Sequence, residues 1–506
     1  MTDLSLLWSG FETALTFHHI LLMVGGVLLG ILVGVLPGLG APNGVTLLLP
    51  LTFTMEPVSA IILLSSMYWG ALFGGSTTSI LFNIPGEPSS VATTFDGHPM
   101  AKNGRTEEAL STAFLSAGFG AFTGVVLVTL IANVVADFAL RFGPAEYFAI
   151  FLLTFCSYVG MSGGRPLKTI VSVLIGLILT AVGMDTVSGE LRLTYGTTSL
   201  INGVSYLAAV IGLFGIGELL VTVEEGLEFN GLKAKMNFRI VWRTFLGMPK
   251  HAVVLVRSTL IGCWMGITPG GPTAASFMSY GIARRFSRNP ENFGKGEPAG
   301  VVAPEAADHS AGVSALLPML SLGIPGSATA AVMMGGLMIW GLQPGPMLFI
   351  EQPDFVWGLI ASMYIANIVA VVLVLTTIPF FASILKAPFS IIGPIIIVVC
   401  LVGAYTIADR MLDVYLALIF GVVGYVFKKL DYPIAPLILA MVLGDKMEDA
   451  FRQALLSSQG SFSIFFSNGL VTTLMVLAAL LACWGLLPRI RFKRKNVPLP
   501  LPENGK

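Results

Sequence analysis

Two apolar segments of the chain meet at Gly34-Val-Leu-Pro-Gly-Leu-Gly-Ala-Pro-Asn-Gly-Val-Thr46, and a shorter version of this stretch returns as Gly266-Ile-Thr-Pro-Gly-Gly-Pro-Thr-Ala-Ala-Ser276. Because proline removes a backbone donor and glycine relaxes φ, we expect helices to break at Pro37-Gly38 and at Pro269-Gly270. Apolar sequence on both sides places each break at membrane depth, where non-helical backbone is tolerated only inside protein or beside a wet cavity. Paired breaks of this kind indicate a binding site within the membrane.

Composition places the chain among polytopic membrane proteins. Of its 506 residues, 55% are hydrophobic and 11% are charged, whereas soluble domains carry about 25% charged residues. Lys+Arg and Asp+Glu balance at 28 each, so nothing favours a nucleic-acid partner. The four cysteines lie far apart inside apolar runs, without metal-ligand spacing, and are interpreted as small buried apolar side chains.

Apolar stretches recur along the whole chain. A spanning helix needs roughly 20 apolar residues, and we expect about ten to twelve crossings. The candidates are 18–36, 57–82, 107–139, 143–162, 166–184 and 200–222 in the first half, and 253–268, 304–323, 327–350, 354–380, 388–406, 411–427, 434–444 and 468–488 in the second. We interpret 38–53, 269–283, 304–323 and 434–444 as half-helices or re-entrant segments. The predicted fold is therefore an all-α polytopic membrane protein.

An ordered pair of motifs appears in each half of the chain. Pro37-Gly38 is followed by Asn83-Ile-Pro-Gly86, and Pro269-Gly270 is followed by Gly323-Ile-Pro-Gly326. A polar segment at 224–257 separates the two sets, which predicts a first membrane repeat at 1–230 and a second at 231–506. The helix before the first break starts at a terminus without basic residues, whereas the helix before the second starts at a basic loop. We therefore predict two repeats of inverted topology.

Basic residues suggest how the chain lies in the membrane. They gather in the 224–257 segment and in the tail from Arg489 to Lys495, so the positive-inside rule places both, and the C-terminus, in the cytoplasm. The N-terminal end is expected outside. Six full crossings before Glu224 would return that segment to the outside, so either one of the six is re-entrant or the N-terminal assignment is wrong.

The polar residues at the breaks are mostly neutral hydroxyls and amides beside glycines. A helix N-terminus carries about half a positive charge and has unsatisfied N–H groups. Short helices starting after the two Pro-Gly breaks and after Pro85-Gly86 and Pro325-Gly326 would form an anion site without a buried Arg or Lys. The alternative is that small residues simply allow close helix packing in lipid. The predicted substrate-binding residues are Gly38, Gly40, Asn43, Thr46, Ser76, Thr77, Thr78, Asn83, Gly86, Gly270, Gly271, Thr273, Ser276, Asp308, His309, Gly326, Ser327 and Thr329.

Other chemistries are disfavoured by the sequence. Gly74-Gly-Ser-Thr-Thr-Ser79 resembles a phosphate-binding loop only in composition, because the Gly-Lys-Ser/Thr ending is missing. With no nucleotide motif, transport would be driven by an ion gradient, with Na⁺ or H⁺ as the coupling cation and no other cofactor. No catalytic motif is placed convincingly, so we expect no enzyme. Asp308 and His309 are singled out because charged groups at membrane depth default to function or pairing.

Several motifs occur together in this chain. They are Gly34-Val-Leu-Pro-Gly-Leu-Gly40, Phe73-Gly-Gly-Ser-Thr-Thr-Ser-Ile-Leu-Phe-Asn-Ile-Pro-Gly-Glu87, Asp96-Gly-His-Pro-Met-Ala101, Gly266-Ile-Thr-Pro-Gly-Gly271, Ala303-Pro-Glu-Ala-Ala307 and Leu322-Gly-Ile-Pro-Gly-Ser-Ala-Thr-Ala330. In combination, and over the stretch from Leu21 to Phe466, they resemble the large membrane subunit of bacterial tripartite tricarboxylate transporters.

The resemblance implies a secondary-active permease of the bacterial inner membrane that imports organic carboxylates such as citrate, coupled to a cation gradient. It also implies a periplasmic solute-binding protein and a small four-helix membrane subunit as partners. An uncoupled anion channel and a non-transporting membrane scaffold subunit remain as alternatives. The chain departs from the family pattern at Asp308-His309, where two asparagines are usual, and at Asp445, where a proline is usual. These departures leave the transported acid open.

Overall fold

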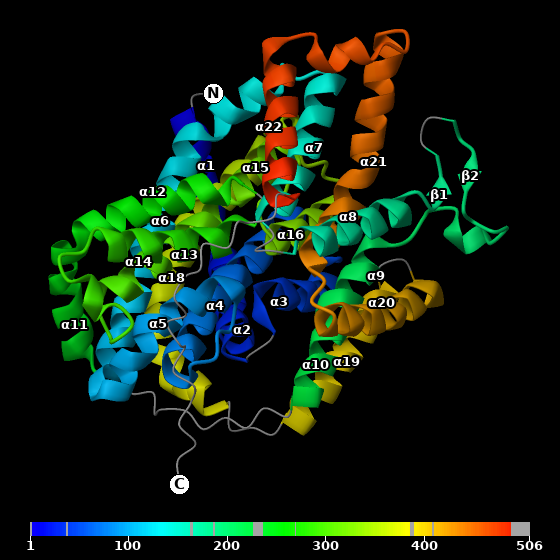
Figure 1. The fold of residues 1–506 in the computed structure, drawn as a ribbon. Coiled ribbons are helices and arrows are strands. Elements are labelled where there is room, and N and C mark those ends of the chain that lie inside the picture. Colours follow the sequence, from blue (N-terminus) through cyan, green and yellow to red (C-terminus); the bar gives the residue numbers. More distant parts are fainter. Residues whose placement is uncertain are drawn as a thin grey trace.

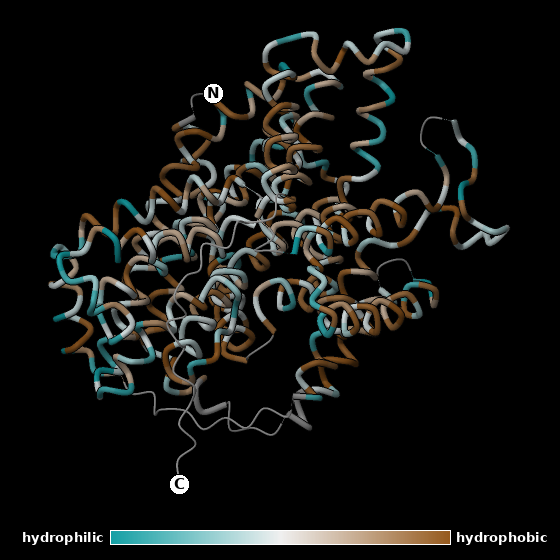
Figure 2. The backbone as a smooth tube through the Cα atoms, viewed as in Figure 1, coloured by the Kyte–Doolittle hydropathy of each residue, from teal (hydrophilic) through white to brown (hydrophobic). Residues whose placement is uncertain are grey.

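The computed structural model describes residues 3–36, 39–161, 165–185, 188–225, 236–268, 270–384, 389–406 and 409–486. The structure is 82% helical. Eight helical segments in the described part are long and apolar enough to cross a membrane, and three shorter apolar helices accompany them. Apolar residues run along these helices over most of their length (Figure 2). The expected all-α polytopic membrane fold is confirmed.

The first half of the chain forms ten α-helices and a small hairpin within the described residues (Figure 1). In order, the elements are α1 (Asp3–Ala14), α2 (Phe17–Val35), α3 (Gly40–Leu48), η1 (Leu49–Thr52), α4 (Pro57–Phe82), η2 (Pro88–Ser90), α5 (Val91–Met100), η3 (Ala101–Arg105), α6 (Thr106–Ala139), α7 (Pro144–Met161), α8 (Pro166–Thr180), β1 (Gly183–Met184), β2 (Leu191–Arg192), η4 (Thr198–Leu200), α9 (Tyr206–Val210), η5 (Ile211–Ile216) and α10 (Gly217–Glu225). The two strands pair antiparallel, with Gly183 opposite Arg192.

The second half repeats the helical pattern without strands among its described residues. Its elements are α11 (Phe238–Gly247), η6 (Met248–His251), α12 (Ala252–Gly266), α13 (Gly271–Arg285), η7 (Pro290–Asn292), α14 (Ala299–Ser314), α15 (Leu316–Leu322), α16 (Ala328–Ile339), α17 (Leu348–Glu351), α18 (Pro353–Ile384), α19 (Phe389–Thr406), α20 (Met411–Lys429), α21 (Ile434–Ser457), η8 (Phe462–Phe466) and α22 (Gly469–Leu486).

Most predicted spans match helices, with three informative differences. The span 57–82 coincides with α4, but the half-helix at 434–444 is wrong, because α21 continues through charged residues to Ser457. The span 304–323 begins earlier than expected, because Pro304 lies inside α14 rather than at its start. Sequence hydropathy also missed α1 and α11, which carry too many polar residues to look like spans.

Close backbone packing explains the glycines before each break. A Cβ atom on Gly34 would overlap the main-chain oxygen of Ala71, where α2 crosses α4, and a Cβ atom on Gly266 would overlap that of Ala311, where α12 crosses α14. For these glycines the close-packing interpretation holds. Since lipid offers no hydrophobic drive between helices, such backbone contact is what holds the pairs together.

Each Ile-Pro-Gly loop rests on the glycine that precedes a break. The nearest atom to a Cβ atom on Gly86 would be the main-chain oxygen of Gly34, and the nearest to one on Gly326 would be that of Gly266. The helix before each loop ends in a left-handed residue, Asn83 with φ 58° and Gly323 with φ 67°. The same contact between an Ile-Pro-Gly loop and a glycine before a break, which we call a joint, is thus built once in each half.

The two halves interlock instead of forming separate bodies. The long helix after each loop packs on the central helix of the other half, α6 on α14 and α18 on α4. The short helices after the breaks cross over in the same way, because α3 packs on α16 and α13 packs on η2. Whether the halves are inverted with respect to the membrane stays a prediction.

Candidate binding site between the two halves

Both predicted breaks are present in the structure. Residues Pro37, Gly38 and Pro269 themselves lie outside the described residues. Around them, α2 ends at Val35 and α3 begins at Gly40, while α12 ends at Gly266 and α13 begins at Gly271. Each short helix is entered through a left-handed glycine, Gly40 with φ 59° and Gly270 with φ 78°, a conformation that an L side chain adopts only with strain.

The helix N-termini at the breaks are engaged by the protein's own groups. The Ala41 N–H at the start of α3 donates to the Glu87 carboxylate. The Gly270 N–H donates to the Gly326 oxygen at 3.1 Å, and the Ser327 side chain accepts from the Ala330 N–H at 3.1 Å, which caps α16. The expectation of free N–H groups therefore needs correction at these three places. At α3 the helix N-terminus already binds a carboxyl group, that of Glu87.

A cluster of polar groups lies where the loops of the two halves meet. From α4, the Tyr68 hydroxyl interacts with the side chains of Ser327 and Thr329. From α14, the Asp308 carboxyl interacts with the Ser89 hydroxyl and with Glu87. Tyr68 and Asp308 are each 2% exposed. We call Tyr68, Glu87, Ser89, Asp308, Ser327 and Thr329 the central cluster.

The central cluster follows the internal repeat. When Gly86 is matched with Gly326, Glu87 corresponds to Ser327 and Ser89 to Thr329. The same register matches Tyr68 with Asp308. Each half therefore sends one side chain from its central helix to the two side chains that follow the Ile-Pro-Gly of the other half.

The central cluster contains acidic groups without a cation beside them. Asp308 interacts with the carboxyl groups of Glu305 and Glu87. Within the described part of the chain, no ion pair joins Glu87 or Asp308 to a Lys or Arg, and the Asp308 Oδ1 atom has no hydrogen-bond partner. An isolated buried carboxylate is costly, so such groups are neutral or accompanied by a bound cation.

Glu305 and His309 form a neighbouring network on the same helix. The Glu305 carboxyl accepts hydrogen bonds from Ser76 at 2.8 Å and from Thr93 at 2.5 Å, which joins α14 to α4 and α5. The His309 Nδ1 atom lies 3.2 Å from the Glu305 main-chain oxygen, and its ring centroid lies 4.5 Å from that of Phe73. The Ser76 hydroxyl is thus engaged in a contact between the halves.

The remaining predicted site residues are mostly held by their own backbone. The hydroxyls of Thr46, Thr77 and Thr78 donate to main-chain oxygens at 2.7, 3.0 and 3.0 Å, one turn earlier in their own helices. A Cβ atom on Gly271 would overlap the Met265 oxygen. Asn43 and Ser276 are buried on α3 and α13, and Asn83 ends α4.

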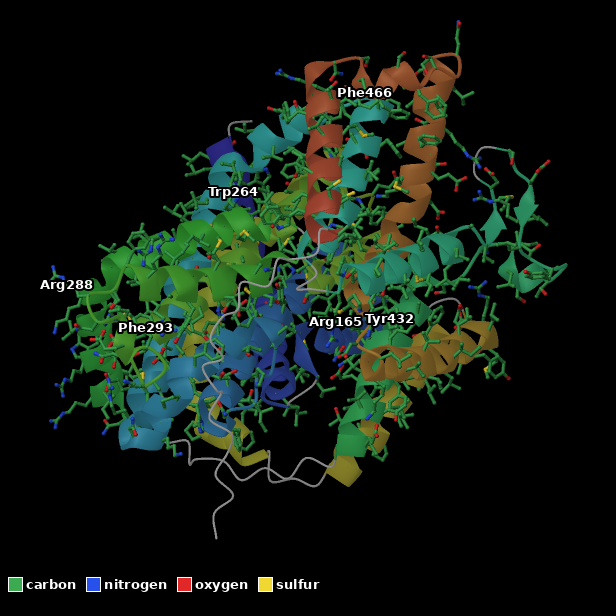
Figure 3. The ribbon with its side chains drawn as sticks, viewed as in Figure 1. Arg165, Trp264, Arg288, Phe293, Tyr432 and Phe466 are labelled. Atoms are coloured by element: carbon green, nitrogen blue, oxygen red, sulfur yellow. The ribbon has the colours of Figure 1, made fainter. Side chains whose placement is uncertain are left out.

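Thr273 and Gly270 face a cavity rather than the central cluster. The cavity measures about 510 Å³ and is also lined by Tyr158, Arg165 and Tyr432, the last two marked in Figure 3. At its edge the Arg165 Nη1 atom lies 2.6 Å from the Asp431 Oδ2 atom. By hydrogen bonding to it, Arg165 holds the pKa of Asp431 below its usual value. This cavity reaches the start of α13.

Comparison with known proteins settles the family. A model of the Tripartite tricarboxylate transporter TctA family matches residues 20–439, which include the whole central cluster and both breaks. The chain belongs to this family. TctA membership implies the large subunit of a tripartite tricarboxylate transporter, which is a multi-pass membrane protein working with other subunits. It also indicates a transporter rather than an enzyme.

Two relatives of this TctA-family chain come from Agrobacterium vitis. An uncharacterized 52.8 kDa protein in the TAR-I ttuC' 3'region is 38% identical over 490 residues, which are 96% of this chain and 97% of the relative. An uncharacterized protein in the TAR-II ttuC' 3'region is 36% identical over 237 residues, which are 47% of this chain and 98% of the relative. No solved structure matches the chain.

Sequence reasoning missed three members of the central cluster in this TctA-family chain. Glu87 and Ser89 directly follow Ile-Pro-Gly, so the loop motif could have indicated them. Tyr68 lies in an apolar run and gives no signal until the repeat register is known. Among the described residues, no group of three His, Cys, Asp or Glu side chains is arranged to hold a metal ion.

Proposed function

We propose that this chain is the permease subunit of a secondary-active importer of organic carboxylates, and that the substrate binds at the central cluster. The observation that carries the proposal is the meeting of both Ile-Pro-Gly loops at Tyr68 and Asp308, next to the helix breaks. Transporter sites typically lie where broken helices of two repeats meet. The predicted binding role of Ser327, Thr329 and Asp308 is part of this proposal.

The hydroxyl groups suit a carboxylate ligand. Tyr68, Ser327, Thr329 and Ser89 each carry an O–H that can donate to an acceptor oxygen of a ligand. All four are buried or nearly so, which strengthens a hydrogen bond by excluding competing water. The central cluster thus provides donors without fixed positive charge, as expected for a site that must both bind and release an anion.

The proposal includes the rest of the assembly. The partners are a periplasmic solute-binding protein and a small four-helix membrane subunit, the location is the bacterial inner membrane, and the C-terminus is cytoplasmic. The two halves are inverted repeats, and the reciprocal packing of α6 on α14 and α18 on α4 supports this arrangement. The driving force is a cation gradient.

Uptake by the complete three-component system in proteoliposomes tests the proposal. Labelled di- and tricarboxylates are offered with and without the binding protein and with and without a cation gradient. We expect uptake only when both are present, whereas an uncoupled channel passes substrate without either.

The double variant Ser327→Ala, Thr329→Val should lower uptake at least tenfold, while Ser461→Ala, on an exposed loop, should not. Unchanged uptake in the double variant would support a scaffold role and reject the site.

A further inference from the structure

We propose that Asp308 carries a proton that is cotransported with the substrate, so that import by this chain is coupled to protons. The inference rests on the proposed function and assigns the coupling ion, which family membership leaves open. It starts from the placement of Asp308 on α14, opposite the loop that follows the first Ile-Pro-Gly.

The surroundings of Asp308 fit a group that changes its protonation state. The side chain is 2% exposed, and its Oδ1 atom has no hydrogen-bond partner within the described part of the chain. The hydroxyl group that interacts with its carboxyl is that of Ser89. A carboxyl held permanently as an anion at such a depth would be expected to gather two or more donors or a cationic partner.

The groups that face Asp308 come from several elements, and none of them in the described residues is a Lys or Arg. Glu305 interacts from the same helix, Glu87 from the first loop and Tyr68 from α4. His309, the next residue, places its Nδ1 atom beside the Glu305 main-chain oxygen. Of the helices packed on α14, α12 brings Cys263, near Ser310 and Ser314, and α13 brings Tyr280, which donates to Asp96 instead.

This arrangement links proton binding to anion binding. A substrate carboxylate that binds among Tyr68, Ser327 and Thr329 comes to lie beside Asp308 and Glu87, so ionised side chains there would repel it. When a proton forms an O–H bond at Asp308, the repulsion falls and a donor is gained. Binding of the two ligands is therefore mutually favourable, as thermodynamic linkage requires. On the cytoplasmic side the O–H bond breaks and the proton leaves with the released anion, so no electrons are exchanged.

Proton movement in proteoliposomes of the complete transporter tests the inference. With sodium absent and no initial gradient, adding substrate outside should acidify the interior of wild-type vesicles, as read by a trapped pH dye. With an imposed gradient, the accumulation ratio should rise about tenfold per pH unit for one coupled proton. Substrate entry without proton entry, or entry driven by sodium alone, overturns the inference. Absence of substrate entry under every gradient would instead reject the proposed function.

A variant ties the proton to Asp308. In Asp308→Asn, which keeps the shape but cannot carry a proton, the accumulation ratio should no longer respond to pH, while exchange of labelled for unlabelled substrate remains detectable. Glu87→Gln should keep a pH response, because the proton-carrying group is still present. Asp137→Asn, an exposed position on α6, serves as the matched control. A pH response in Asp308→Asn equal to that of the wild type contradicts the assignment. If Asp308→Asn lacks exchange altogether, the wild-type dye measurement still decides.

Discussion

The loop at Ile84-Pro-Gly86 and the loop at Ile324-Pro-Gly326 rest on the same backbone joint but carry different chemistry. Each glycine sits on the oxygen of a glycine that precedes a break, and each loop follows a left-handed residue. After the first loop, the Glu87 carboxylate holds the N–H of Ala41 in α3. After the second, the Ser327 hydroxyl caps α16.

The comparison separates what the repeat duplicates from what it varies. At each joint the main chains touch directly, so neither half has room there for a side-chain atom. The side chains of the central cluster differ in chemistry between its two pairs. Tyr68 with Ser327 is a pair of hydroxyl groups, whereas Asp308 with Glu87 is a pair of carboxyl groups. A substrate at the centre would therefore meet neutral donors on one side and carboxyl groups on the other.

The largest loss of stability is expected when a side chain is introduced at a glycine of either joint. Gly34→Val and Gly266→Val should each destabilise the fold by about 1–3 kcal/mol or more, because the added atoms overlap Ala71 or Ala311 backbone and little can move. Thermal unfolding in detergent measures the loss. Gly281→Ala, where an added Cβ meets nothing within 4 Å inside α13, should not destabilise the fold. If one half tolerates valine, the two joints are not equivalent.

A second effect is expected where α5 of the first half is held to the second half. The Asp96 Oδ1 atom on α5 accepts from the N–H groups of Gly294, Gly296 and Glu297 at 2.8–2.9 Å, and Oδ2 accepts from the Tyr280 hydroxyl at 2.9 Å. Asp96→Asn should cost roughly 1.5–3 kcal/mol, since these bonds go to a charged group.

The measurement for Asp96→Asn is again the unfolding midpoint. Asp137→Asn, at an exposed carboxyl, is the control and should not change it. A midpoint for Asp96→Asn equal to that of the wild type would mean that this clamp does not hold α5 to the second half.

A smaller effect should be seen in transport alone. Tyr68→Phe removes the hydroxyl that meets Ser327 and Thr329, and a lost hydrogen bond of about 1–1.5 kcal/mol corresponds to roughly tenfold lower uptake. The unfolding midpoint should change little, because the ring stays packed. Tyr415→Phe, at an exposed position, is the control. Normal uptake in Tyr68→Phe would mean that the Tyr68 hydroxyl does not take part in substrate binding.

The smallest effect is expected at the mouth of the cavity beside α13. Arg165 and Asp431 are about half exposed, so water screens their attraction and Arg165→Gln should change stability only slightly. Because the pair lowers the pKa of Asp431, its contribution is present above the usual Asp pKa and is lost as the pH falls through the lowered value. Unfolding midpoints of wild type and variant at neutral and acidic pH should therefore converge on acidification. A loss of stability as large as that expected for Asp96→Asn would point to a further role for Arg165.

The amino-acid sequence predicts more of the fold than of the candidate site. Apolar length alone delimited α4, and the Pro-Gly pairs marked both breaks, since these signals are local. The interpretation of 434–444 failed because α21 continues outside the apolar stretch, where length and hydropathy say nothing. Asp308 stood out as a charge in an apolar run, but Tyr68 became visible only once packing had fixed the register of the two halves.

A structure of the complete transporter with bound substrate tests the central assignment most directly. We predict that a substrate carboxylate lies between Tyr68 and Asp308, within hydrogen-bond distance of Ser327 or Thr329. A substrate bound elsewhere, with these side chains in contact with one another as they are now, would contradict it.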